Sequence, residues 1–217
     1  MKKLALVCIA LAALVMAAWA FDEDDLNLVS FKTSTSATIE YIFLSPGDSD
    51  YWGPEILGSE RVLEPGESLG FYIHYPDDCN TFDIMAVSED GQTFMVYDYE
   101  ICDGTSEVIE IVKKDLTDDP PSMELVTIHI RNDTLPLYYV FVSPEDSDYW
   151  GVDYLDEDSI LDMDESVSFL FPAEDEPASY VVMAVDEEGD EYRFRFDVDA
   201  GSDDTTFAIE ISDLYVE

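Results

Sequence analysis

The residues of this chain that are best placed to do chemistry are carboxylates in a loop that occurs twice. Clustered hard oxygen ligands on a loop between strands suit Ca²⁺. The alternative is a purely architectural loop, because Asp and Ser side chains close turns on their own backbone, and the spacing lacks the Gly and terminal Glu of an EF-hand. We favour architecture and keep a calcium site as the alternative, with six candidate ligands: Asp48, Asp50, Glu55, Asp146, Asp148 and Asp153.

Aromatic residues follow these carboxylates in both loops. Tyr51 and Trp52 in the first loop correspond to Tyr149 and Trp150 in the second. Aromatic rings beside carboxylates could form a binding surface for a sugar or a peptide. We favour the simpler interpretation, in which the rings pack into the core of their own module.

Catalytic residues are few. The chain has two His, and along the repeat described below His74 aligns with Pro172 and His129 with Phe31, so neither is repeated. No Gly-x-Ser-x-Gly or His-Glu-x-x-His motif occurs. Pairs of carboxylates are expected by chance among 51 acidic residues. The sequence therefore predicts a protein that is not an enzyme.

Three cysteines are present, and two of them suggest a disulfide. Cys8 lies within an apolar segment at the start of the chain, whereas Cys79 and Cys102 lie in the first of two modules. In an exported protein such a pair is most simply one disulfide. The second module has Pro177 and Ala200 at or near the matching places, so we expect this crosslink to stabilise one module only.

An internal repeat organises the chain. Residues 41–53 recur as residues 139–151 at an offset of 98, with ten of thirteen positions identical. The offset continues without a gap as far as Gly201, where we expect a two-residue insertion that aligns residues 109–111 with 209–211. Duplication of this extent predicts two copies of one structural unit.

The repeat divides the chain into segments. We expect a signal peptide at 1–20, a first module at 21–112, a linker at 113–124 and a second module at 125–217. Pro120 and Pro121 stiffen the linker. Two small domains follow from this division.

Within each copy the apolar residues recur with a period of two, as in strands with one buried and one solvated face. Hairpin turns are expected at 88–91 and 186–189, where Gly supplies a positive φ. Short strands spaced near ten residues, without an amphipathic helix, predict an all-β fold of two immunoglobulin-like β-sandwiches, with a small β-barrel as the alternative. The clearest strands are 38–44, 69–75, 82–87, 107–112 and 192–199.

The first twenty residues resemble an export signal. Lys2 and Lys3 precede an apolar stretch at residues 4–17, and Ala18-Trp19-Ala20 forms an A-x-A cleavage site. We expect cleavage before Phe21 and no transmembrane segment afterwards. The signal predicts export and leaves periplasm, cell surface and extracellular medium open.

Charge restricts the class of partner. The chain carries 9 Lys and Arg against 51 Asp and Glu, a formal net charge of −42. Removal of Lys2 and Lys3 with the signal leaves 7 − 51 = −44. Such a charge excludes the electrostatic basis of nucleic-acid binding and indicates adaptation of the whole surface to high cation concentration.

Several of these residues also carry a resemblance. The chain is similar to a family of short exported bacterial modules of unassigned function at Ser45-Pro46, Trp52-Gly53, Leu57, the run Leu63 to Ser68, Asp83 and Gly91. In the second copy the similarity lies at Ser143-Pro144, Trp150-Gly151, Leu155 and Gly189. Members of that family commonly carry a Cys before and after the Asp-x-x-Gly hairpin, which matches Cys79 and Cys102. The resemblance implies module boundaries but no activity, cofactor or catalytic residue.

Taken together, these features predict an exported, non-enzymatic binding or structural protein of the bacterial periplasm or cell surface, with Ca²⁺ as a possible stabilising cofactor. Its partner would be a protein or a surface glycan. One alternative is an enzyme or an enzyme inhibitor with a site between the two modules. Another is an inert acidic surface protein adapted to high salt.

Overall fold

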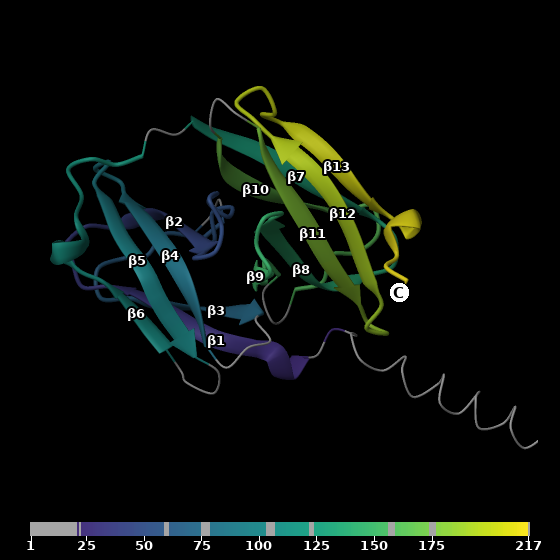
Figure 1. The fold of residues 1–217 in the computed structure, drawn as a ribbon, viewed down its shortest axis with the longest axis horizontal. Helices are drawn as coiled ribbons and strands as arrows, with labels where there is room; N and C mark the ends of the chain where they lie inside the picture. Colours follow the sequence, from purple (N-terminus) through teal and green to yellow (C-terminus); the bar gives the residue numbers. More distant parts are fainter. Residues whose placement is uncertain are drawn as a thin grey trace, which may run out of the picture.

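The computed structural model describes residues 21, 23–58, 61–74, 79–102, 107–121, 124–155, 159–173 and 177–216. The predicted signal peptide and Cys8 lie outside these residues. Strands dominate the described chain, and its three helical segments are single 3₁₀ turns (Figure 1). None of the described helices is long and apolar enough to cross a membrane.

The described residues form thirteen strands, which divide between the two repeats. The first repeat holds β1 (Leu26–Thr33), β2 (Ile39–Pro46), β3 (Ser68–His74), β4 (Cys79–Ser88), β5 (Thr93–Cys102) and β6 (Glu107–Ile111). The second holds β7 (Glu124–Asp133), β8 (Leu137–Pro144), β9 (Gly151–Val152), β10 (Ser166–Ala173), β11 (Ala178–Asp186), β12 (Glu191–Val198) and β13 (Thr205–Glu210). The 3₁₀ turns are η1 (Glu23–Asp25), η2 (Lys113–Asp115) and η3 (Ile211–Asp213).

Each repeat is built from two sheets. In the first repeat, β6-β1-β3 and β2-β4-β5 are the sheet orders, and in the second, β10-β7-β13 and β12-β11-β8. The first and last strands of each repeat run parallel, so that β1 pairs with β6 and β7 with β13. The strands β4 and β5, and likewise β11 and β12, form the two predicted hairpins, whose glycines Gly91 and Gly189 have φ values of 73° and 81°.

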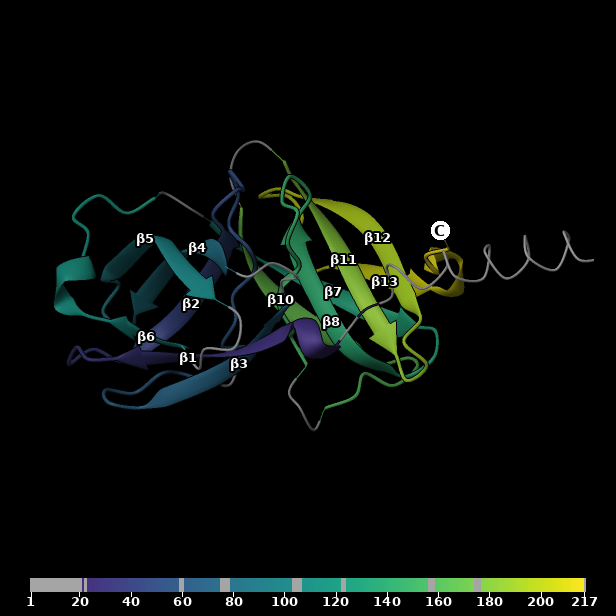
Figure 2. The same ribbon diagram turned by 60° about the horizontal axis from the view of Figure 1, so that its bottom comes forward.

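The sheets of each repeat face each other across a hydrophobic core. Along β1 the buried side chains alternate at Val29, Phe31 and Thr33, which is the period-two pattern of a strand with one inward face. Both sheets of a repeat contribute to its core, and each repeat has a core of its own. Figures 1 and 2 show the two groups of strands side by side. The all-β prediction is confirmed, with sheets that pack as a sandwich.

The strand order differs from that of immunoglobulin domains. An immunoglobulin sandwich pairs strands ABED over CFG, with its last two strands as a hairpin. Here the last strand of each repeat leaves the sheet of its predecessor and joins the first strand in the opposite sheet. Each repeat therefore has its first strand, β1 or β7, inside one sheet, and β4 or β11 at the centre of the other.

Strand pairing corrects two details of the repeat alignment. Phe31 pairs with Ile109 and Ile130 pairs with Phe207, so Ile109 corresponds to Phe207 at an offset of 98. The predicted two-residue insertion is therefore wrong, because the matching Ile-Glu-Ile letters are not structurally equivalent. In the first strand of each repeat the offset is 99, so His129 is equivalent to Ser30 rather than to Phe31.

The first repeat extends beyond its last strand. η2 follows β6, and Leu116 forms an isolated bridge with Phe94. The Thr117 N–H then donates to the Thr93 carbonyl at 2.9 Å. In the second repeat, η3 and the Leu214–Tyr192 bridge do the same. Residues 113–117, expected in the linker, thus belong to the first repeat.

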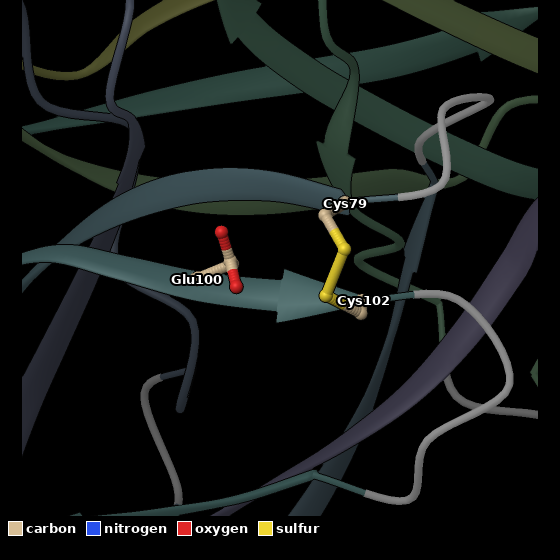
Figure 3. Close-up of side chains that lie close together, drawn as sticks. All are labelled: Cys79, Glu100 and Cys102. Atoms are coloured by element: carbon tan, nitrogen blue, oxygen red, sulfur yellow. A yellow bond between two sulfur atoms is a disulfide. The ribbon is translucent and has the colours of Figure 1, made fainter.

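The predicted disulfide is present. Cys79 and Cys102 face each other at the end of the β4–β5 hairpin, with an S–S distance of 2.05 Å and a sequence separation of 23 (Figure 3). The bond closes the open end of the hairpin. It therefore ties together two strands that the turn at Gly91 joins at their other end.

Candidate functional site: the paired loops between the repeats

The two best-preserved loops of the sequence meet each other. Asp146 accepts hydrogen bonds from the Ser49 hydroxyl (2.6 Å) and the Asp50 N–H (3.1 Å). Asp48 in turn accepts from the Ser147 hydroxyl (2.9 Å) and the Asp148 N–H (3.2 Å). Each loop gives the other the same set of contacts, which is the signature of an interface with two-fold symmetry.

A second reciprocal pair joins backbone to backbone beside the loops. The Glu55 N–H donates to the Leu170 carbonyl, and the Asp153 N–H donates to the Tyr72 carbonyl, both at 2.8 Å. Glu55 and Asp153 are 98 residues apart, as are Tyr72 and Leu170. The approximate two-fold relation therefore extends from the loops to the edges of the sheets.

The side chains of Glu55 and Asp153 turn back into their own repeats. The Glu55 carboxylate accepts from the N–H groups of Ile42 (3.1 Å), Leu57 (2.6 Å) and Gly58 (2.7 Å). Asp153 accepts from the N–H groups of Val140 and Leu155 at 3.0 and 3.1 Å. Both residues are buried, and their carboxylates fix the end of the loop to the strand that precedes it, β2 or β8.

Burial changes the acidity of Glu55. Removal from water raises the pKa of this carboxyl to about 7, although the three N–H donors and the nearby Arg61 act in the opposite direction. Burial also raises the pKa of Tyr154 well above its usual range, and the charge of Glu55 adds to that effect. Tyr154 donates to the Pro54 carbonyl of the first repeat at 3.1 Å. A titratable group and its neighbour thus lie at the boundary between the repeats.

The loop tyrosines are exchanged between the two cores. Tyr51 packs against the core of the second repeat, and Tyr149 packs against the core of the first. The prediction that these two tyrosine rings pack into the core of their own module is therefore wrong. Tyr154 contacts both cores. Each repeat fills part of its partner's hydrophobic interior.

A strand of the second repeat completes a sheet of the first. β9 pairs with β3 through Ile73 with Val152 and His74 with Gly151. The symmetric counterpart would pair residues 53–54 with 171–172, where Pro54 and Pro172 stand. Proline has no N–H for a ladder, which explains why only one side of the interface has this strand.

The two loop tryptophans have different surroundings. The Trp52 carbonyl accepts a hydrogen bond from the buried Tyr180 hydroxyl at 2.8 Å. Trp150 instead lies against the Arg193 guanidinium, whose carbon is 5.2 Å from the ring centroid and 4.0 Å from that of Tyr215. Both tryptophans are partly buried, and the structure uses them in packing around the interface.

Phe21, the expected first residue of the mature chain, lies at the same boundary. Its ring is 5.6 Å from His74 and 4.7 Å from Tyr139, measured between centroids. The Tyr139 hydroxyl donates to Glu23 at 3.0 Å. Burial lowers the pKa of His74 to about 4, with Glu191 opposing and Arg193 adding to the shift. His74 is therefore a neutral packing residue at neutral pH.

One constellation was not anticipated from sequence. On the outer face of the β10-β7-β13 sheet, His129 Nδ1 lies 2.8 Å from the Ser168 hydroxyl and His129 Nε2 lies 3.0 Å from Asp204. Ser, His and Asp in contact are the parts of a nucleophilic triad. The three come from three different strands or turns, so no local motif could reveal them.

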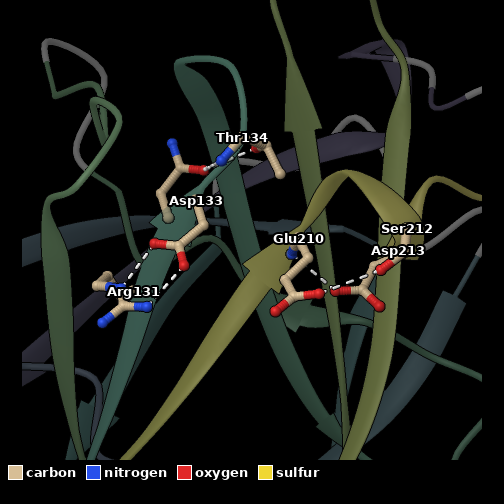
Figure 4. A network of polar contacts seen from close by, with 7 residues as sticks. Arg131, Asp133, Thr134, Glu210, Ser212 and Asp213 are labelled. Atoms are coloured by element: carbon tan, nitrogen blue, oxygen red, sulfur yellow. Dashed lines mark hydrogen bonds and ion pairs between the residues drawn. The ribbon is translucent and has the colours of Figure 1, made fainter.

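The surroundings of this Ser-His-Asp group differ from those of a hydrolase. A triad works with a buried acid on Nδ1 and the nucleophile on Nε2, whereas here the order is reversed and the Asp204 side chain is 88% exposed. Arg131, the nearest cation along β7, is bound by Asp133 through two hydrogen bonds of 2.6 Å (Figure 4). Neither a water-excluded acid nor an available positive group therefore supports Ser168.

These contacts occupy most of the oxygens that the calcium prediction would use. Of the six candidate ligands, Asp48 and Asp146 bind the opposite loop, and Glu55 and Asp153 bind their own backbone. Asp50 and Asp148 contribute their N–H groups to the interface, and both residues are exposed. A calcium ion would have to share Asp48 and Asp146 with their present donors.

Within the described part of the chain, one other set of residues gathers potential metal ligands. The ligand atoms of Cys79, Glu100 and Cys102 lie within 4.8 Å of one another (Figure 3). Both sulfurs are joined in the disulfide, and a thiolate is the form that binds metal. This group is therefore a crosslink with a neighbouring carboxylate.

Comparison with protein-family models, with curated proteins and with solved structures found no match. What can be inferred about function therefore depends on the geometry of this chain. The resemblance to exported bacterial modules stays a prediction.

Proposed function

We propose that this chain is an exported, non-enzymatic structural or binding protein in which two β-sandwich repeats are fastened into one rigid unit. The observation that carries the proposal is the reciprocal pairing of the loops at residues 48–50 and 146–148. The motif that duplication has preserved best is used to hold the repeats together. Although Asp48 and Asp146 are exposed, their oxygens accept hydrogen bonds from the opposite loop, and the rings of Tyr51 and Tyr149 pack against the opposite core.

The chemistry of the buried groups is consistent with this role. Glu55 has the raised pKa of a general acid, but its oxygens accept three backbone hydrogen bonds and it is 5% exposed. A general acid must reach the proton acceptor on its substrate. Glu55 therefore supports an architectural role rather than an enzyme site between the repeats.

The binding part of the proposal rests on charge. With a net charge of −44 after loss of the signal peptide, the exterior attracts cations and basic surfaces and repels nucleic acid. A protein or a surface glycan presented in a cation-rich environment fits this exterior. Export to the periplasm, the cell surface or the medium is part of the same proposal, and the disulfide is compatible with it.

The non-enzymatic role is tested at Ser168. The mature protein would be treated with a fluorophosphonate probe and assayed against activated esters, beside Ser168→Ala and Ser166→Ala. Ser166 lies two residues away on the same strand and is also exposed, which makes it a matched control. We expect no labelling and no hydrolysis above the buffer rate. Labelling that Ser168→Ala removes and Ser166→Ala retains would replace this proposal with a hydrolase.

Calcium stabilisation is tested separately by thermal unfolding. The melting temperature would be measured with EDTA, with millimolar CaCl₂, and with NaCl at the same ionic strength. A specific ion stabilises by mass action, whereas screening depends on ionic strength alone. A larger rise with Ca²⁺ that Asp50→Asn and Asp148→Asn abolish would support calcium as a cofactor. Equal responses to the two salts would remove calcium from the proposal.

A further inference from the structure

Each of the paired loops is complementary to a copy of itself. The four hydrogen bonds between the loops use an Asp carboxylate, a Ser hydroxyl and an Asp N–H, at residues 48–50 and again at 146–148. These three residue types are identical in the two loops. No hydrogen bond of this set depends on a position at which the repeats differ.

The neighbouring contacts are equally independent of the side chains. The bonds from Glu55 to Leu170 and from Asp153 to Tyr72 join backbone N–H and carbonyl groups. The second repeat therefore offers the same pairing surface to the first repeat of its own chain and to the first repeat of another molecule. A surface of this kind forms isologous dimers.

The length of the linker determines whether the repeats pair within one chain or between two molecules. Thr117 is bound to the first repeat through Thr93, and β7 begins at Glu124, so six residues, 118–123, connect the repeats. A short connection raises the effective concentration of the second repeat near the first. When a connection becomes too short to span, the same contacts form between chains.

We propose that the partner for this interface is a second copy of the chain, and that two copies exchange their second repeats. The first repeat of each molecule then pairs through its loop with the second repeat of the other, in a closed dimer with two-fold symmetry. Every contact between the repeats is kept, and only the path of the linker changes. This goes beyond the proposed function and does not depend on whether the protein is an enzyme.

The test shortens the linker in the mature chain. Deletion of residues 118–121 takes away most of the reach between Thr117 and Glu124, including Pro120 and Pro121. We expect light scattering after size-exclusion chromatography to give twice the monomer mass for this variant. Circular dichroism should show the same strand content as the wild type.

A matched pair of loop variants identifies the interface. In the deletion background, Asp48→Ala with Asp146→Ala removes the acceptors of all four loop hydrogen bonds and should weaken the dimer at least about tenfold. Asp50→Ala with Asp148→Ala removes the same number of charges but keeps the N–H donors. This control should leave the dimer intact.

Two outcomes would overturn the proposal. One is a deletion variant that stays monomeric and as stable as the wild type. The other comes from a second experiment, which does not require the deletion variant to fold. Two differently tagged wild-type chains are unfolded together and refolded at high protein concentration. Exchange predicts species that carry both tags, and the recovery of singly tagged monomers alone at every concentration would exclude it.

Discussion

At the scale of single residues, Glu55 is the group whose protonation the fold controls most strongly. Its pKa is about 7 in the folded protein against 4.5 for the free side chain. Between these pH values the folded state binds more protons than the unfolded state. The contribution of Glu55 to the free energy of unfolding therefore increases as the pH falls from 7 towards 4.5. The buried charge, present above pH 7, is what the fold has to accommodate.

The prediction for Glu55 concerns how the free energy of unfolding changes with pH. Unfolding in urea at a series of pH values should show that wild type gains stability on acidification relative to Glu55→Gln, which cannot take up a proton. Because the variant shares every other carboxylate, the difference between the two curves isolates this group. Parallel curves between pH 4.5 and 7 would contradict the assignment.

For His74, acidification has the opposite effect on stability. Burial lowers the pKa of His74 to about 4 from 6.5, so in this range the unfolded state binds more protons, and stability is lost as the pH falls from 6.5 to 4. Urea unfolding of His74→Gln should show less acid destabilisation than the wild type in that window. A larger loss in the variant would mean that the ring is charged in the folded protein.

At the scale of elements, two nearby aspartates of the first loop contribute different groups to the interface. Asp48 accepts two hydrogen bonds from the opposite loop, whereas Asp50 contributes its backbone N–H. We expect Asp48→Ala to lower the free energy of unfolding by about 1–2 kcal/mol and Asp50→Ala to leave it nearly unchanged. Chemical denaturation without added Ca²⁺ measures both. Equal losses for the two variants would indicate that the side chains act together, as ligands would.

The disulfide is an element that one repeat has and the other lacks. It closes a segment with a sequence separation of 23, for which the chain-entropy model gives about 3 kcal/mol. Replacing Cys79 and Cys102 by Ser should lower the melting temperature, and a reducing agent should do the same to the wild type but not to the variant. If reduction destabilises both equally, another bond is responsible.

Much of the fold can be predicted from the sequence because its strands alternate clearly. Residues 192–199 were expected as a strand and form β12 at Glu191–Val198. The hairpin turn at 88–91 implies a strand after Gly91, but the bounds of β5 were not predicted, because Asp98, with φ of 51°, interrupts its period at a register shift opposite residues 82–84. β1 was missed since Leu28, 46% exposed, blurs the alternation of its inward side chains.

The candidate site was less predictable. The Asp-Ser-Asp pattern fits a calcium loop and an interface equally well, because both use carboxylate oxygens as acceptors. Its partners lie 96 to 100 residues away in sequence, and strand periodicity carries no information on such contacts. Identity of the two loops was the available signal, since an interface between copies of one module places the same residues opposite each other.

At the scale of the whole molecule, the two repeats behave in this account as halves of a fused dimer. Tyr51 and Tyr149 pack into each other's cores, and β9 adds to the sheet of β3. Burial of apolar surface across the boundary couples the unfolding of one repeat to that of the other. Two domains on a flexible tether would unfold independently instead.

Differential scanning calorimetry of the mature protein, beside Asp48→Ala with Asp146→Ala, tests this coupling most directly. We predict one cooperative transition for the wild type, with equal calorimetric and van't Hoff enthalpies, and separate or broadened transitions for the double variant. Two resolved transitions in the wild type, unchanged by the double substitution, would show that the loops do not join the repeats into one unit.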